Sequence, residues 1–254
     1  MVCSHNPLFI PGDNFEAIRL VRERGLQTSE SYISQVSYSD LSNELAKAQS
    51  GKKALKEEGM LAKLYPSLNP IINEMFFCNN LILTEGIEDV AYISTYLFLT
   101  KNMEVFRRYG GHIVPAGGKS KIIKPLATAK LLNLPVFVVC DADTDKKNEE
   151  MHKKNNKSIL TLLGYDDLDE WPKNNIYEKN LTMWSKDITE VIKTEFNNRW
   201  EEFQAEASSY YGDPGSLNKN HLAIARALEI AWDKGCKSCE LIKLINSIIS
   251  FIKE

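Results

Sequence analysis

The feature that most constrains this chain is an alternation of short apolar runs with helix-length segments between residues 80 and 164. The pattern predicts strands at 81–84, 112–115 and 135–140, and helices at 89–100, at 120–132 and from the polar stretch that ends near 163. Strands that are apolar throughout indicate a sheet buried on both faces. Strands that alternate with helices predict parallel pairing through right-handed crossovers. The expected fold class is therefore α/β.

The segments on either side of this alternation have a different character. Residues 1–39 are broken by prolines, with strand-like character at 17–21 and 34–38, and residues 40–79 show helical spacing of leucines. Beyond the alternation, apolar stripes predict helices at 188–203, 221–232 and 240–252. We therefore divide the chain at 1–39, 40–79, 80–195 and 196–254.

Composition excludes several classes of protein. The 254 residues include 43% hydrophobic residues and carry a formal charge of −3, which excludes disorder over most of the chain. No apolar run approaches the roughly 20 residues that a membrane helix needs, so no membrane partner is expected. No signal peptide is visible, and five scattered cysteines favour reduced thiols in the cytoplasm.

Carboxylates follow two of the predicted strands. Glu85 comes after the first strand, with Asp89 four residues later, and Asp141 and Asp143 follow the third strand. In an open parallel sheet, ligands bind beyond the carboxyl ends of the strands, so these acids are expected to converge. Such a cluster repels itself unless a cation neutralises it, and oxygen ligands favour Mg²⁺ or Mn²⁺. The alternative for each acid, above all for Asp89, is a helix cap or a loop position.

Three segments carry a resemblance to a known family. TEGIEDVAYI, GGHIVPAGGKSK and VFVVCDADTDK resemble the motifs of a TOPRIM domain, with Glu-Gly after the first strand and Asp-x-Asp after the third. More narrowly they resemble the OLD (overcoming lysogenisation defect) family, in which an ABC-type ATPase precedes a TOPRIM nuclease. The sequence Met183-Trp184 leading to Asp187 is similar to a later acidic motif of that family, and Lys219 stands where the family keeps an essential lysine.

The resemblance implies a fold, an activity and a ligand set. It implies a TOPRIM catalytic domain at 80–195 with an accompanying helical segment at 196–254. It also implies a metal-dependent DNA endonuclease with two Mg²⁺ or Mn²⁺ ions. Their ligands would be Glu85, Asp89, Asp141 and Asp143, with Asp187 and Glu190 as further ligands. One ion would activate the attacking water and the other would stabilise the leaving oxygen. Lys219 would neutralise charge on the phosphate.

Two alternatives to this nuclease stay open. Another TOPRIM chemistry is one, although neither a nucleophilic tyrosine domain nor a zinc-binding primase N-terminus is visible. The other is a non-cleaving TOPRIM module that binds nucleic acid or phosphate for regulation. Retention of Glu85, Asp141 and Asp143 favours the nuclease.

The N-terminal residues 3–7, CSHNP, resemble the last strand and histidine switch of an ABC-type ATPase. This predicts that 1–39 is a remnant of the ATPase edge and that the chain is the C-terminal part of a longer protein. The ATPase domain is then an expected partner, and any oligomer is expected to form through it. The alternative is an ordinary loop histidine at His5.

Basic residues gather in one stretch. Residues 107–130 contain six basic side chains and no acid, which predicts a DNA-phosphate surface at Arg107, Arg108, Lys119 and Lys121. A solvated helix face is the alternative. Gly118-Lys119-Ser120 is not a P-loop, because Ile113 stands where that motif needs glycine. Cys236 and Cys239 form a lone C-x-x-C, for which packing cysteines are expected.

Overall fold

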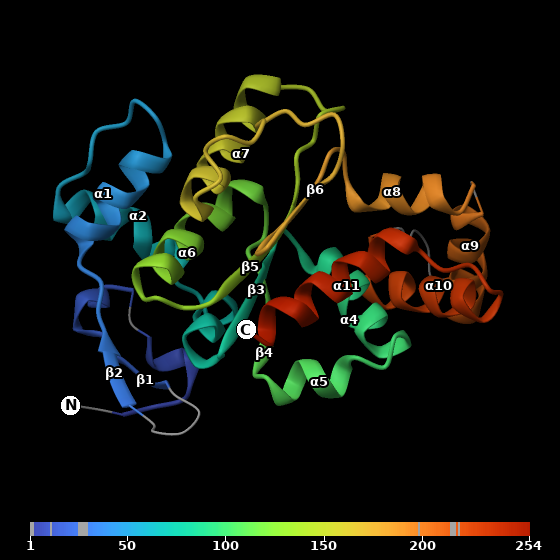
Figure 1. Ribbon diagram of the computed structural model, residues 1–254, viewed down its shortest axis with the longest axis horizontal. Coiled ribbons are helices and arrows are strands. Elements are labelled where there is room, and N and C mark those ends of the chain that lie inside the picture. The colour runs from blue at the N-terminus through green and yellow to red at the C-terminus, as the bar shows by residue number, and fades with distance from the viewer. Residues whose placement is uncertain (1–2, 11, 25–29, 198, 214–216, 218) are drawn as a thin grey trace.

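The computed structural model describes residues 3–10, 12–24, 30–197, 199–213, 217 and 219–254. Its centre is a five-stranded sheet with the strand order β4-β3-β5-β7-β6 (Figure 1). The strands are β3 (Asn80–Thr84), β4 (Gly111–Pro115), β5 (Val136–Asp141), β6 (Ile176–Glu178) and β7 (Leu181–Trp184). The first four strands in that order are parallel, and β6 runs antiparallel to β7 at the edge.

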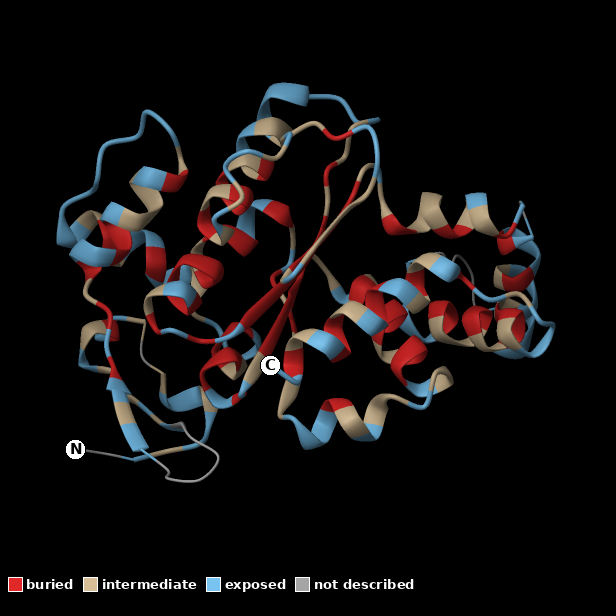
Figure 2. Ribbon diagram, viewed as in Figure 1, coloured by how far each residue is buried: buried red, intermediate tan, exposed pale blue. Residues whose placement is uncertain are grey.

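Successive residues of the central strands enter two separate hydrophobic cores. Leu81 and Leu83 of β3 belong to one core, whereas Ile82 between them belongs to the other. In β5, Val138 and Val139 divide in the same way. Figure 2 shows these strands as buried almost throughout, between helices on both sides. This arrangement confirms the α/β sheet that the unbroken apolar runs predicted.

The first core lies beneath helices that come mainly from the N-terminal half of the chain. These helices are α1 (Tyr38–Ala48), α2 (Glu57–Leu64), α3 (Pro70–Asn73), α6 (Lys119–Leu131) and α7 (Glu149–Leu163), with 3₁₀ turns at Pro7–Phe9, Phe15–Ala17, Tyr65–Ser67 and Glu74–Phe77. A separate hairpin, β1 (Leu20–Arg24) and β2 (Glu30–Ser34), is tied to this side because Ser34 Oγ donates to Leu132 O at 3.1 Å.

The second core is covered by helices that come mainly from the C-terminal half. They are α4 (Ile87–Leu99), α5 (Met103–Arg108), α8 (Ile188–Glu195), α9 (Trp200–Tyr210), α10 (His221–Asp233) and α11 (Cys239–Ile252). Ser238, the N-cap of α11, joins three of them: its N–H donates to Tyr96 Oη at 2.8 Å and its hydroxyl donates to Glu195. No helix in the described ranges is long and apolar enough to span a bilayer.

Several local expectations are wrong in detail. The helix expected at 188–203 is two helices, α8 and α9, because Asn197 adopts a left-handed conformation with φ of 49°. The strand-like segments expected at 17–21 and 34–38 are displaced to β1 and β2, and α1 begins at Tyr38. Residues 3–6, which resemble the last strand of an ABC-type ATPase in sequence, form no strand, and the preceding Val2 lies outside the described residues.

Candidate functional site

Four parallel strands end at one edge of the sheet, and acidic residues stand there. Glu85 directly follows β3, Asp141 is the last residue of β5, and Asp187 lies three residues beyond β7. The strands are held in register because Thr84 pairs with Val139 and Asp141 pairs with Trp184. Carboxyl ends of adjacent parallel strands form the usual ligand crevice of such sheets.

Glu85 is held by the loop that follows β4. Its carbonyl oxygen accepts hydrogen bonds from the N–H groups of Gly117 and Gly118, each at 2.7 Å. Both glycines have positive φ, 83° and 135°, a backbone conformation that other residues rarely adopt. Burial raises the pKa of the Glu85 carboxyl to about 8, against the opposing effect of Lys119 and with smaller contributions from Asp89 and Asp143.

Asp89 has a structural role at the start of α4. Its Oδ2 accepts a hydrogen bond from the N–H of Gly86 at 2.8 Å, as an acid in the first turn of a helix often does. The side chain is buried, and burial raises its pKa to about 7 although the Gly86 hydrogen bond opposes the shift. The structure therefore places Asp89 as a helix-capping residue, which was the alternative to a metal ligand at this position. A metal-binding role for Asp89 stays a prediction.

Asp141 is the least satisfied acid of the site. Its Oδ1 is shielded from solvent and has no hydrogen-bond partner among the described residues. Burial, followed by repulsion from Asp89 and Glu85, raises its pKa well above the ordinary value. A buried acceptor without a donor lowers the stability of the folded protein. A proton or a bound cation at this oxygen would remove that cost.

Asp143 is already paired with two basic groups. Its Oδ2 lies 2.5 Å from Lys119 Nζ and 3.0 Å from His152 Nδ1, and these two nitrogens are 3.3 Å apart. Lys119 is only 7% exposed, so it acts as an internal counter-ion of the acidic cluster rather than as a surface contact for DNA. His152 was not among the predicted site residues. The only signal for it was its place in the helix that follows the Asp-x-Asp segment.

The three remaining candidates, Asp187, Glu190 and Lys219, are held by local contacts or are exposed. Asp187 is the N-cap of α8: its Oδ1 accepts from the Glu190 N–H at 2.9 Å and its Oδ2 lies 3.0 Å from Lys146 Nζ. Glu190 instead pairs with Lys193 at 3.3 Å along α8. Lys219 is exposed just before α10, and it forms no ion pair with any described carboxylate.

The expected basic surface does not form as one patch. Arg107 and Arg108 end α5 and therefore precede β4, whereas Lys119 and Lys121 begin α6 after β4. The five residues of β4 separate the two pairs by about 16 Å along the strand. The arginines consequently lie at the amino edge of the sheet, opposite the acids. Sequence proximity was misleading because a strand carries the chain from one edge to the other.

The donor set fits a hard divalent cation. Carboxylate oxygens are the ligands that Mg²⁺ and Mn²⁺ prefer, and the unpartnered Asp141 Oδ1 offers one of them. Within the described residues, however, no three His, Cys, Asp or Glu side chains are already arranged to hold a metal ion. Asp143 would have to exchange Lys119 for the cation. The C-x-x-C offers no competing zinc site: Cys236 Sγ accepts from Arg199 at 3.0 Å and Cys239 is exposed rather than packed.

The Lys119–Asp143 pair gives a first test of this description. Replacing Lys119 with Met leaves Asp143 beside other acids without its counter-ion, and breaking a buried ion pair typically costs about 3–5 kcal/mol. We expect a loss of that order in urea unfolding of metal-free protein, partly recovered in Mg²⁺. Lys121→Met, at an exposed position two residues along the same helix, is the matched control. Equal stability of the two variants would show that the pair is not important for the fold.

A match to a protein-family model agrees with the α/β fold at the centre of the chain. Residues 76–143 match the family model described as "Overcoming lysogenization defect protein-like, TOPRIM domain". One similar solved structure is the C-terminal region of the OLD protein of Burkholderia pseudomallei. It is 14% identical, with a TM-score of 0.45, over 70% of this chain and 98% of that one. A search of curated proteins found no match. The matched segment runs from the end of the turn before β3 to Asp143, and it identifies the centre of this chain as an OLD-like TOPRIM domain.

Proposed function

We propose that this chain is a divalent-metal-dependent DNA endonuclease. An OLD-like TOPRIM domain indicates a nuclease-type module. The single observation that carries the proposal further is the buried, unpartnered Oδ1 of Asp141, on a carboxyl whose pKa is raised beside Glu85. A group that is this unfavourable without a cation is typical of a functional site rather than of a structural one.

The residues of the chain have distinct roles in this proposal. Glu85, Asp141 and, after release from Lys119, Asp143 would hold Mg²⁺ or Mn²⁺, with Asp89 behind them and with Asp187 and Glu190 as outer candidates. Two such ions supply the Lewis acidity needed for in-line hydrolysis of a phosphodiester. Gly117 and Gly118 hold the backbone of Glu85 in place. His152 would remain a hydrogen-bonding partner of Asp143 when Lys119 moves away.

A second candidate is a non-cleaving module that binds nucleic acid or phosphate. The observation that favours it is the Lys119–Asp143 pair, which neutralises part of the cluster without any metal. Supercoiled plasmid incubated with Mg²⁺, Mn²⁺, Ca²⁺ or EDTA separates the two candidates. Nicked or linear product in Mg²⁺ or Mn²⁺ and none in EDTA supports the nuclease. Uncut plasmid in every lane, with retained binding of DNA, supports the second candidate.

Lys219 provides a sharper test of the catalytic proposal. If its ammonium reaches the scissile phosphate when DNA binds, Lys219→Ala should reduce the cleavage rate by about 10²-fold or more. The Mg²⁺-induced rise in melting temperature should be unchanged, because Lys219 is no metal ligand. Lys219→Arg should recover only part of the rate, since a planar guanidinium places its charge differently. A rate within a factor of about two of wild type would make Lys219 an ordinary exposed loop lysine.

We also propose that an ATPase domain of the same parent protein is a partner of this chain. Exposed apolar side chains near the N-terminus support the proposal that a partner domain covers this part of the surface. Leu8 and Phe9 are 72% and 64% exposed, and Val21 and Ile33, which face each other across the β1–β2 hairpin, are 61% and 67% exposed. Adjacent exposed apolar side chains such as Val21 and Ile33 often mark an interaction surface. The proposed partner rests on the resemblance of residues 3–7 and on the TOPRIM match. The proposed action in the cytoplasm rests on the five scattered cysteines, which favour reduced thiols.

A further inference from the structure

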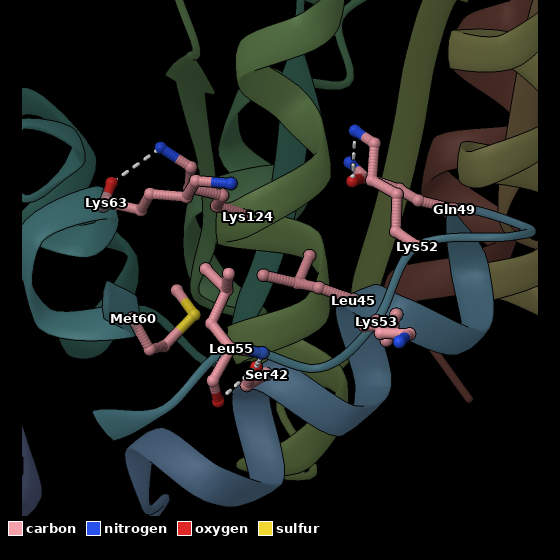
Figure 3. Close-up of a pocket in the computed structure, with 10 residues that line it drawn as sticks. Ser42, Leu45, Gln49, Lys52, Lys53, Leu55, Met60, Lys63 and Lys124 are labelled. Atoms are coloured by element: carbon pink, nitrogen blue, oxygen red, sulfur yellow. Dashed lines mark hydrogen bonds between the residues drawn. The ribbon is translucent and has the colours of Figure 1, made fainter. Parts of the chain in front are cut away.

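A cavity of about 530 Å³ lies between α1, α2 and α6, away from the acidic cluster (Figure 3). Its apolar floor includes Leu45, Leu55 and Met60, and four lysines surround that floor. Lys63 and Lys124 lie on one side of the leucines in Figure 3, and Lys52 and Lys53 lie on the other side.

None of these four lysines forms an ion pair with a carboxylate of the described residues. Lys124 Nζ donates to Lys63 O at 2.6 Å and to Ser67 Oγ at 2.7 Å, and Lys52 Nζ donates to Gln49 Oε1 at 2.7 Å. Burial and the nearby Lys63 lower the pKa of Lys124. In a chain with a formal charge of −3, four lysines without acidic partners around one cavity form a local positive surface that attracts anions.

One helix, α6, contributes both to the cavity and to the candidate active site. Helix α6 begins at Lys119, which pairs with Asp143, and Lys124 stands five residues later. At 1.5 Å of rise and about 100° of rotation per residue, the backbone of Lys124 lies about 8 Å along the helix axis from that of Lys119, and its side chain leaves the helix about 140° around from that of Lys119. Exposed Lys121 lies between them, one helical turn from Lys124 on the same side of the helix. The lysines therefore extend from the start of α6 to α2 and to the segment that connects α1 with α2.

We propose that this lysine-rimmed cavity binds the sugar-phosphate backbone of the substrate DNA beside the scissile bond. The proposal rests on the nuclease function above and deepens it by assigning a path for the DNA. Lysines supply compact positive charges for phosphate oxygens, and the apolar floor suits the faces of the sugars. Among the described residues, no aromatic side chain lines the cavity, so stacking of a flipped base is not the proposed mode of contact.

The test measures DNA affinity as a function of salt. The variant K52Q/K53Q/K63Q removes three exposed charges and leaves Lys124, which makes internal hydrogen bonds, in place. Binding of a 20-base-pair duplex and of a 20-nucleotide strand is measured in Mg²⁺ by fluorescence anisotropy, with Asp141→Asn present to prevent cleavage. The control K237Q/K243Q/K253Q removes the same charge from exposed positions around α11, which packs on the opposite face of the sheet.

We expect the cavity variant to bind about 10²-fold more weakly near 0.1 M salt and to lower the slope of log K against log salt by about 2. The control should change the slope by less than about 0.5. If wild type cleaves plasmid but the two triple variants bind DNA equally, this DNA path is wrong and the nuclease proposal stands. If the cavity lysines control binding but no metal supports cleavage, the path stands and the nuclease proposal fails.

Discussion

Asp141→Asn is expected to reduce plasmid cleavage to the level seen in EDTA while the protein stays folded. The substitution keeps the shape of the side chain but removes the carboxylate oxygen that has no partner in the described structure. It therefore removes the metal ligand that we propose at the end of β5, and it also removes charge repulsion from Asp89 and Glu85. Metal-free Asp141→Asn should melt at or above the wild-type temperature at pH 8, and the rise in melting temperature on adding Mg²⁺ should be lost.

Asp145→Asn is the matched control for this prediction. Asp145 is an exposed acid four residues further along the same loop, where it pairs with Lys146 at 3.1 Å. Its substitution should leave both the cleavage and the Mg²⁺-induced shift unchanged, because exposed pairs contribute little. Full activity of Asp141→Asn, or cleavage that persists in excess EDTA, would rule out metal-dependent catalysis at this carboxylate.

The centre of the fold could be predicted from the sequence because its strands are apolar throughout. β3, β4 and β5 with their following helices lie within one or two residues of the expected positions. Since parallel strands end at the same edge, Glu85 and the Asp-x-Asp pair were expected to converge, and they do lie at that edge. β7 was not predicted as a strand: its four residues include Thr182 and lie within a polar stretch. Asp187 was therefore found through family resemblance alone.

The contacts around Asp143 could not be predicted in the same way. Lys119 and His152 are 33 residues apart, on α6 and α7, and they meet because both helices pack on the same face of the sheet. The periodicity of apolar residues within a helix does not show how that helix is rotated relative to a neighbouring helix. The same limit explains why Arg107 and Arg108 were grouped with Lys119. Charge spacing along the chain does not show at which end of a strand each residue lies.

The second large effect expected of this site is a fall in the stability of metal-free protein as pH rises. Glu85 has its pKa raised from 4.5 to about 8 and Asp89 has its pKa raised from 3.8 to about 7, chiefly by burial. Between the unfolded and folded values, the folded protein holds protons that the unfolded chain has released. The stability that these groups contribute is complete below about pH 4 and is lost as pH rises through 7 and 8.

Each proton retained in this way changes the free energy of unfolding by about 1.4 kcal/mol per pH unit. Unfolding in urea at pH 6, 7 and 8 in EDTA should therefore show a steady loss of stability. The double variant Glu85→Gln/Asp141→Asn, which lacks two of the titrating acids, should show a smaller slope. A metal-free stability that is constant over this range would contradict the burial of charge at the acidic cluster.

Divalent metal should reverse this pH dependence, because a cation binds the deprotonated carboxylates and displaces their protons. The Mg²⁺-induced rise in melting temperature should then be larger at pH 8 than at pH 6. Calorimetric titrations in buffers of different ionisation enthalpy should show that protons are released on binding. Asp145→Asn should behave like wild type, since its carboxyl is exposed and outside the cluster. A Mg²⁺ effect of equal size at both pH values, with no proton release, would place the metal away from Glu85 and Asp141.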